Sequence, residues 1–336
     1  MATICISSSL ILTIILSVFA IIIPVTFSLQ VRFYQESCPR AESVTKRIVK
    51  KNFLKDPSIP GGLIRLHFHD CFTRGCDGSV LIDSDSRNVA EKDAPPNLSL
   101  RGFEVIDEIK QELEKQCPGL VSCADILALA TRDSVALSGG IKYKLPTGRR
   151  DGIISRMVDV RLPGPSFSVQ ATLMALRNVG LDLDDLTTLL GAHSIGFCHC
   201  VFFINRLYDF QGKEGEADPD LDPQLLIQLR EKCPRPQGNQ VFNLSQDNTV
   251  FMNPSSNTNF VLDNSFYTSV IQRKSLLQLD QGLAFTGLSS KLAEKYANDS
   301  QLFRNKFAKA MIKLGNIVTA EEGEVRLDCR KVNKRV

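Results

Sequence analysis

The sequence predicts an all-α protein, and two observations support this fold class: the helical spacing of its apolar residues and the scarcity of strand patterns. Apolar residues recur at helical spacing along most of the chain, whereas the alternating patterns typical of strands are short and few. No repeat of fixed period is present. The composition, with 43% hydrophobic and 23% charged residues, is that of a soluble globular protein. It excludes disordered, collagen-like and multispanning membrane proteins, and a net charge of +3 over 336 residues gives no argument for nucleic-acid binding.

Helix stop signals and amphipathic runs predict the individual elements. The first helix has Val44, Ile48, Val49 and Phe53 at helical spacing. Residues 117–119 (CPG) stop the third helix, and Gly139 and Gly140 close the fourth. The expected helices span residues 42–54, 62–72, 103–116, 121–137, 169–179, 183–191, 223–232, 266–274 and 289–313. Residues 241–264 are expected to be irregular.

The first 29 residues differ from the rest of the chain. Residues 10–27 are apolar except for Thr, Ser and Pro24, and the first charged residue is Arg32. This pattern is typical of a secretory signal, although an uncleaved membrane anchor is the alternative. Pro24 breaks the helix near its end and the remaining chain is rich in cysteine, so we expect a signal peptide at residues 1–29 and a single domain at residues 30–336.

Secretion changes the meaning of the cysteines. Removal of Cys5 leaves an odd number, which in an oxidising compartment indicates a disulfide framework with one thiol left over. A zinc site is the competing interpretation, with Cys198, His199 and Cys200 as its fragment, but this spacing is unusual for zinc and no second cluster completes the set. Eight paired cysteines allow on the order of a hundred connectivities, so spacing alone assigns none.

All four histidines fall within residues 65–71 and 191–199. On a helix Arg65 and His69 lie one turn apart and share a face. A cation beside a neutral imidazole can stabilise developing negative charge while the imidazole moves a proton, although the same spacing also occurs in ordinary packed helices. His67 points elsewhere and is expected to be structural.

The two histidine segments resemble known motifs. Residues 65–71 (RLHFHDC) resemble the distal haem motif of the secreted plant (class III, horseradish-type) peroxidases, and residues 185–195 (DLTTLLGAHSI) resemble their proximal haem motif. Further matches occur in order at residues 33–39, 121–125, 148–151 and 279–281. The resemblance implies the haem peroxidase fold, with about ten or more helices in two lobes around a haem and minimal β structure. It places the distal lobe at about 30–160 and the proximal lobe at about 161–310, with the C-terminal segment returning to the distal lobe.

The resemblance also implies a reaction and its residues. Hydrogen peroxide is reduced through a ferryl intermediate, and phenolic donors are then oxidised in one-electron steps. His69 is the general base, Arg65 stabilises charge on the breaking O–O bond, Asn97 accepts a hydrogen bond from His69, and Glu91 orients Asn97. A catalytically weak haem-binding scaffold or surface-interaction protein is the alternative. Asn97 also lies in one of three glycosylation sequons, which begin at Asn97, Asn243 and Asn298.

On the proximal side the resemblance makes His193 the axial ligand of a haem b iron. Asp280 would accept the other N–H of His193 and raise its electron donation. Pro163 would lie at the channel mouth, where its carbonyl contacts aromatic donors.

Residues 70–79 concentrate oxygen donors directly after His69. Two carboxylates, a hydroxyl and carbonyl groups suit calcium, while a polar turn is the alternative. The resemblance assigns this first calcium to Asp70, Thr73, Gly75, Asp77 and Ser79, with Glu91 bound through water. It assigns a second calcium to Ser194, Ser255, Thr258, Val261 and Asp263. We expect the second ion to be weak or absent, because Ser255 stands where the family usually has Asp.

The resemblance pairs Cys38 with Cys117, Cys71 with Cys76, Cys123 with Cys329 and Cys200 with Cys233. Cys198 is then left free. The expected protein is a secreted monomer of the extracellular space or cell wall, with no nucleic-acid partner and no membrane contact after signal cleavage.

Overall fold

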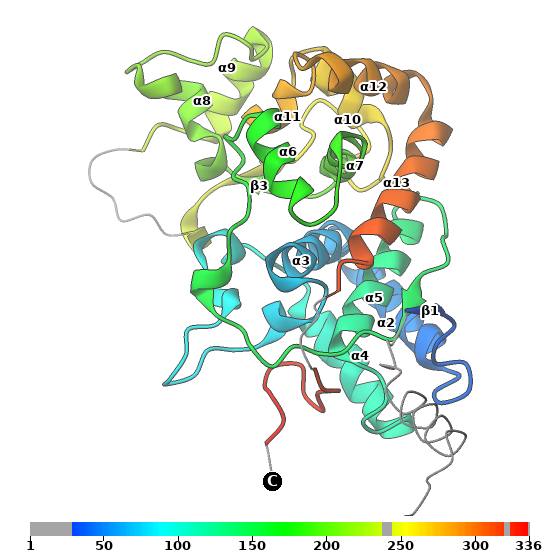
Figure 1. The fold of residues 1–336 in the computed structure, drawn as a ribbon. Coiled ribbons are helices and arrows are strands. Elements are labelled where there is room, and N and C mark those ends of the chain that lie inside the picture. The colour runs from blue at the N-terminus through cyan, green and yellow to red at the C-terminus, as the bar shows by residue number, and fades with distance from the viewer. Residues whose placement is uncertain (1–28, 237–243, 319–322, 335–336) are drawn as a thin grey trace, which may run out of the picture.

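The computed structural model describes residues 29–236, 244–318 and 323–334. Within these ranges the protein contains twelve α-helices and four short strands (Figure 1), which confirms the all-α class with minimal β structure. No helix of the described ranges is long and apolar enough to cross a membrane. Residues 1–28 of the expected signal segment and Asn243 lie outside the described residues.

The helices follow the predicted order with several differences in their bounds. They are α2 (Ala41–Lys55), α3 (Ile59–Arg74), α4 (Phe103–Gln116), α5 (Cys123–Leu137), α6 (Val169–Arg177), α7 (Leu183–Leu189), α8 (Ile204–Tyr208), α9 (Pro223–Lys232), α10 (Ser265–Ile271), α11 (Gln278–Gly282), α12 (Gly287–Asn298) and α13 (Ser300–Gly315). The short helices α8 and α11 were not predicted. A helix of one turn buries too few apolar residues to show a periodic pattern.

Two antiparallel strand pairs connect segments that are distant in sequence. β1 (Gln30–Val31) pairs with β2 (Pro146–Thr147), and β3 (Phe197–His199) pairs with β4 (Thr249–Phe251). β4 lies in the stretch that the sequence predicted to be irregular, so that prediction is wrong for these three residues. Such short strands are stabilised by their partner across the ladder, which the local sequence does not reveal.

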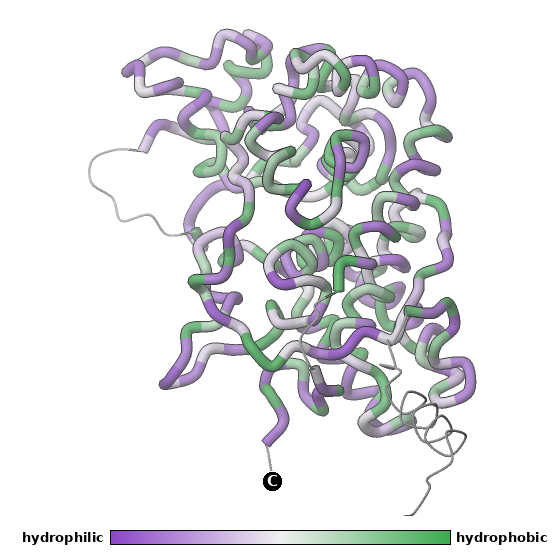
Figure 2. Tube along the Cα trace, viewed as in Figure 1, coloured by the Kyte–Doolittle hydropathy of each residue, from purple (hydrophilic) through white to green (hydrophobic). Residues whose placement is uncertain are grey.

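The helices form two packed groups (Figure 1). Helices α2–α5 contact one another around one hydrophobic cluster, and α7, α10, α12 and α13 pack around a second one. Figure 2 shows hydrophobic and hydrophilic residues interleaved along the helices, as expected for helices that bury one face. Helix α3 contacts α5 in the first group and α13 in the second, so it is shared between both groups.

Four disulfides fix the fold, and they join the pairs that the resemblance implies: Cys38–Cys117, Cys71–Cys76, Cys123–Cys329 and Cys200–Cys233. Because Cys200 is paired with Cys233, it is not a zinc ligand. The bond from Cys329 to the first residue of α5 returns the C-terminal segment to the first helix group. There the Arg326 guanidinium donates to the Gly78 carbonyl, and both residues are buried.

The predicted single helix at residues 289–313 is two helices, which corrects that prediction. Helix α12 ends at Asn298, and Asp299 leaves the helical conformation with φ −136° and ψ 93°. The Asp299 carboxylate accepts the backbone N–H of Leu302 at 2.8 Å and thereby caps α13. Apolar periodicity continues across this break, so hydropathy alone does not detect a cap that depends on one polar side chain.

We expect Asp299→Ala to lower the free energy of unfolding by about 1 kcal/mol, since the first turn of α13 loses its cap. Chemical denaturation monitored by circular dichroism measures this change. Asp299→Asn is the matched control and should remain close to wild type, because asparagine is an equally good cap. Equal stability of the alanine and asparagine variants would show that the break between α12 and α13 does not depend on this cap.

Candidate functional site

A cavity of about 580 Å³ lies among α3, the segment after α7 and the loop that contains Pro163. Its volume is within the range of small-molecule and cofactor pockets. Most of its lining is apolar, with Phe68, Leu162 and Leu279 among the contributors. Its arginines and histidines are Arg65, His69, Arg101, His193 and His199. The predicted site residues of both histidine motifs therefore face one cavity.

Helix α3 positions the first histidine. His69 is buried, and its Nδ1 lies 2.6 Å from the Oδ1 of Asn97. The Nδ2 of Asn97 donates to the backbone carbonyl of Glu91 at 2.7 Å, so Oδ1 is the atom that faces the histidine. Since Oδ1 can only accept, Nδ1 of His69 carries the proton and Nε2 keeps its lone pair. Glu91 thus orients Asn97 through its main chain and not through its carboxylate.

Arg65 lies one turn before His69 and also lines the cavity. Its Nη2 donates to the carbonyl of Pro96 at 2.9 Å, next to Asn97 in the chain. Burial lowers the pKa of Arg65 to about 10, which still leaves the guanidinium charged at neutral pH. Burial, with a smaller contribution from Arg65, lowers the pKa of His69 to about 3. A neutral imidazole therefore lies beside a permanent cation.

The second histidine follows α7 in a short 3-10 turn, Leu190–Ser194. His193 Nδ1 lies 2.9 Å and 3.0 Å from the two carboxylate oxygens of Asp280, which belongs to α11 and is 1% exposed. The carboxylate accepts, so His193 Nδ1 donates and Nε2 is left available to bind a metal. A ligand histidine with a buried carboxylate partner is the usual arrangement at a metal centre.

The segment after His69 gathers buried acidic groups. Asp70, Asp77 and Glu91 are at most 2% exposed. Asp70 Oδ1, both carboxylate oxygens of Glu91 and Ser79 Oγ have no hydrogen-bond partner among the described residues. Burial and the neighbouring Asp77 raise the pKa of Asp70 well above its usual value, and burial raises the pKa of Glu91 to about 8. Buried oxygens that lack a positive partner are a donor set for a hard cation.

The residues of the second predicted calcium site are arranged differently. One carboxylate oxygen of Asp263 accepts from Thr258 Oγ1 at 2.7 Å, and the other accepts from the backbone N–H of Ser265 at 2.9 Å. Ser194 is buried and its hydroxyl accepts the backbone N–H of Asp263 at 3.4 Å. Ser255 and Val261 are exposed. In the described chain no buried oxygen of this set lacks a partner.

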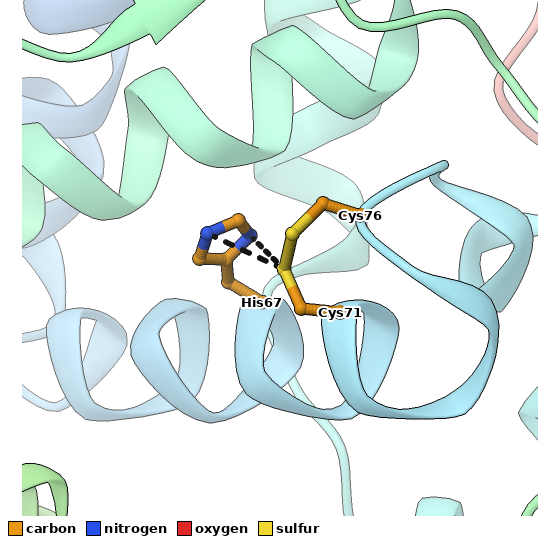
Figure 3. Close-up of side chains that lie close together, drawn as sticks. All are labelled: His67, Cys71 and Cys76. Carbon is orange, nitrogen blue, oxygen red and sulfur yellow. Dashed lines mark hydrogen bonds between the residues drawn. A yellow bond between two sulfur atoms is a disulfide. The ribbon is translucent and has the colours of Figure 1, made fainter. Parts of the chain in front are cut away.

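A third group of potential ligands, His67, Cys71 and Cys76, lies in the core (Figure 3). The two cysteines form a disulfide, and Cys71 Sγ lies 3.5 Å from His67 Nδ1. A disulfide has no thiolate to bind a metal, so this cluster is structural. Burial, with a smaller contribution from Arg149, lowers the pKa of His67 to about 3, so this histidine is uncharged at neutral pH.

The remaining predicted positions are also located. Pro163 lines the cavity. Asn97 is 2% exposed and both amide atoms are hydrogen bonded, so the folded protein has no room for a glycan there. Asn298 is exposed at the end of α12.

The sequence analysis missed one part of the cavity wall. Arg101 lines the cavity and donates to Ser58 Oγ at 2.8 Å and to Asp56 at 2.6 Å. These residues are far apart in sequence and carry no shared motif, so only the packing of the loop after Asn97 against the start of α3 brings them together. Ser99 and His199 also line this cavity. The Ser99 hydroxyl and His199 Nδ1 are buried and have no hydrogen-bond partner among the described residues, although His199 Nδ1 lies 3.7 Å from an Asp247 carboxylate oxygen.

Cys198 is the free cysteine of the described residues, and it lines the cavity. It is 6% exposed, and burial raises the pKa of its thiol to about 12.

We expect iodoacetamide to leave Cys198 unmodified in the folded protein at pH 8 and to alkylate it in guanidinium chloride. In the folded protein the thiol is protonated and the reagent cannot reach it. Peptide mass mapping identifies the labelled residue. Full labelling of the folded protein would contradict this burial.

Comparisons with known proteins agree with this geometry. The family model described as peroxidase matches residues 45–299, which include both histidine motifs and Asp280. Peroxidase 5 of Vitis vinifera is 47% identical over 310 residues, covering 91% of this chain and 92% of that protein.

Two relatives from Arabidopsis thaliana match to a similar extent. Peroxidase 57 is 43% identical over 321 residues, or 95% of this chain and 97% of that protein. Peroxidase 64 is 44% identical over 316 residues, or 93% and 96%. Matches of this extent over the whole described fold show that the chain belongs to the peroxidase family, among the plant class III peroxidases.

Proposed function

We propose that this peroxidase binds one haem b between His69 and His193, reduces hydrogen peroxide and oxidises phenolic donors by one-electron steps. The observation that carries the proposal is one cavity lined by two histidines with opposite partners. His193 has a buried carboxylate, Asp280, which suits a metal ligand. His69 has an amide, Asn97, and an adjacent cation, which suit an acid–base catalyst.

The cavity residues fit haem. His193 Nε2 is available because Nδ1 donates to Asp280, and the apolar lining suits a large planar ring. At the polar part of the wall, the Arg101 guanidinium can hold an anionic group of a bound cofactor. When bound, haem supplies the redox centre that takes electrons from organic donors and passes them to peroxide.

His69 then moves the proton. Its Nε2 lone pair takes a proton from one oxygen of hydrogen peroxide and returns it to the other oxygen, which leaves as water. The depressed pKa of His69, about 3, keeps the imidazole in the form that can accept. The hydrogen bond from Nδ1 to Asn97 keeps the protonated nitrogen away from the cavity, so Nε2 is the nitrogen that faces hydrogen peroxide.

Arg65 stabilises the negative charge that grows on the departing oxygen. The guanidinium has five N–H groups, and the Pro96 carbonyl accepts a hydrogen bond from Nη2. The remaining N–H groups can donate to the departing oxygen. Arg65 and His69 share one face of α3, so charge stabilisation and proton transfer act at the same place in the cavity.

The donor side of the proposal rests on the lining of the cavity. Pro163, Leu162 and Phe202 are half-buried and contribute an apolar part of the wall, which favours flat aromatic molecules. A catalytically weak scaffold is not favoured, because the acid–base histidine, its amide partner and the arginine are all in place. Small phenols are therefore the proposed donor class.

We also propose one firmly held calcium at Asp70, Asp77 and Ser79, with Thr73 and Gly75 as carbonyl ligands and Glu91 acting through water. The unpartnered buried oxygens of Asp70, Ser79 and Glu91 support it. The carbonyl of Gly75 already accepts the N–H of Asp77 at 2.8 Å, but a carbonyl has a second lone pair. The cation would offset the repulsion among the buried carboxylates.

A second calcium at Ser194, Ser255, Thr258, Val261 and Asp263 is proposed to bind weakly. Asp263 supplies the one carboxylate of this set, and hydroxyl and backbone groups already satisfy both of its oxygens. Calcium would have to displace these hydrogen bonds, and calcium affinity falls with the number of charged ligands.

Secretion is the third part of the proposal. Four disulfides among the described residues indicate an oxidising compartment. The apolar stretch at residues 10–27 is the proposed signal, and the mature protein is proposed to act as a monomer outside the cell.

His69→Ala should slow the reaction with hydrogen peroxide by about 10⁴-fold, since His69 serves both proton transfers. Arg65→Leu should be milder, about 10²-fold, because it removes charge stabilisation and leaves the proton path. Stopped-flow absorbance of the haem band after peroxide addition measures both rates.

His199→Gln is the matched control, because it alters a histidine of the same cavity that has no place in the proton path. Its rate should remain close to wild type. A His69→Ala variant that reacts at nearly the wild-type rate would remove the acid–base role from this residue.

Elemental analysis after exhaustive dialysis should find one calcium per chain in the wild-type protein. Ser255→Asp adds a carboxylate to the second site and should raise the content towards two, whereas Asp70→Asn should lower it towards zero. Two firmly retained ions in the wild-type protein would show that Ser255 does not weaken the second site.

A further inference from the structure

The protein contains few side chains that can be oxidised by one electron. It has no tryptophan and five tyrosines. Tyrosine is a phenol, the same chemical class as the proposed donors, so a tyrosine near the cavity can take their place when none is bound. Two of the five, Tyr267 and Tyr296, are packed against each other in the second helix group.

A continuous series of rings leads from the cavity to these tyrosines. His193 and Phe266 have ring centroids 6.1 Å apart, and Phe266 and Tyr267 are 5.0 Å apart. Tyr267 and Tyr296 are again 5.0 Å apart. Every separation is within the range of direct aromatic contact, and Phe266, Tyr267 and Tyr296 are at most 3% exposed. Electron transfer along this series needs no step through solvent.

Close packing fixes the series beneath the turn that carries His193. A Cβ atom at Gly191 would lie 2.6 Å from the Tyr267 hydroxyl and 2.5 Å from the Phe303 ring, so only glycine allows this approach. Phe303 itself contacts both tyrosines. The rings are therefore held in one arrangement by α10, α12 and α13, which lie together in Figure 1.

The two tyrosines differ in what can take their proton. Tyr267 donates to the backbone carbonyls of Thr187 and Thr188 at 2.9 Å and 3.2 Å, and a carbonyl is not a base. The hydroxyl of Tyr296 lies 3.5 Å from Asp184 Oδ1 and 2.8 Å from Thr188 Oγ1. The Asp184 side chain is 44% exposed, so a proton that it accepts can pass to water.

Burial raises the pKa of both tyrosine hydroxyls, so neither is ionised at neutral pH. Oxidation then requires that the proton leave together with the electron. Tyr296 has a carboxylate to receive it and Tyr267 does not. Tyr296 is therefore better suited than Tyr267 to lose a proton and an electron together.

We propose that Tyr296 is a one-electron oxidation site linked to the cavity through Tyr267 and Phe266. The inference rests on the proposed function, since hydrogen peroxide reduced in the cavity is the oxidant. Peroxide takes two electrons, of which Tyr296 supplies one, and the other oxidising equivalent stays in the cavity until a donor supplies the second electron. One electron leaves the Tyr296 phenol towards the cavity, the O–H bond breaks, and the proton goes to Asp184. A neutral phenoxyl radical remains, and one electron and one proton from a donor at the surface near Asp184 and Lys306 restore the tyrosine.

The site serves a peroxidase that meets peroxide when its cavity holds no donor. An oxidising equivalent that remains in the cavity attacks the surrounding side chains, among them Cys198 and Met252, which line it. Transfer to Tyr296 moves that equivalent away from these sulfur atoms to a group whose product a surface phenol can reduce.

The test uses the haem-loaded full-length protein, mixed with one equivalent of hydrogen peroxide without donor and frozen within milliseconds. Electron paramagnetic resonance should show a tyrosyl radical in the wild-type protein. Tyr296→Phe should remove most of this signal, since it deletes only the hydroxyl. Tyr208→Phe is the matched control and should keep the signal, because Tyr208 contacts Arg230 and lies outside the ring series.

Two further measurements distinguish a radical site from a structural role. Asp184→Asn keeps the shape of the side chain but is no base, so the radical should form more slowly, and deuterated water should slow it further in the wild type. A nitroso spin trap should attach to the peptide that contains residue 296, as shown by mass mapping. The wild-type and variant haem bands and melting temperatures establish that the folds are equal.

The outcomes separate this inference from the proposed function. A haem band that does not respond to peroxide overturns both. A band that responds normally, with an equal radical signal in wild type and Tyr296→Phe, overturns only the assignment of Tyr296. Loss of the signal in Tyr296→Phe but not in Tyr208→Phe supports it.

Discussion

The hydrogen bond between His69 Nδ1 and Asn97 Oδ1 is the interaction on which the candidate site depends. It leaves Nε2 of His69 unprotonated towards the cavity, and it holds only because Asn97 is fixed by the Glu91 carbonyl. The Glu91 carboxylate turns towards the buried acidic group that starts at Asp70, the residue after His69. The contacts therefore connect His69, Asn97 and Glu91 with Asp70, so they begin and end on α3. A cation bound to the acidic group would therefore help to fix the orientation of the His69 ring.

The C-terminal segment also stabilises the loop that contains Asp77 and Gly78. Arg326 donates to the carbonyl of Gly78 inside the acidic loop, and its backbone N–H donates to Asp151, which also accepts from the start of α5. The disulfide from Cys123 to Cys329 keeps this segment in place. Residues about 250 positions apart in sequence thus support the loop beside the candidate base, which explains why the first helix group and the end of the chain form one unit.

The two sides of the cavity are built for different tasks. On the α3 side the partners of His69 are an amide and a cation, so the imidazole stays neutral, as the proposed proton transfer requires. On the other side His193 meets a buried carboxylate, which increases the electron density on the ring. Aromatic rings pack against both histidines: Phe266 lies beside His193, and Phe68 lies beside His69. The two histidines therefore differ in their hydrogen-bond partners and not in their aromatic neighbours.

The sequence by itself determined the all-α class, most helix positions and the residues of the two histidine motifs, because helical periodicity and short motifs are local properties. The resemblance to the peroxidase family also implied Asn97 and Asp280, which are distant from their histidines in sequence. Only the tertiary structure decided that Glu91 acts through its carbonyl, that Arg101 reaches the cavity wall, and that Tyr267 and Tyr296 pack against each other. The first contact depends on the backbone path of two neighbouring turns, and the other two depend on which distant segments pack. The spacing of residues along a chain specifies neither. The break at Asp299 is different, because it depends on a local signal. One capping side chain ends the helical run, although the apolar pattern continues across it.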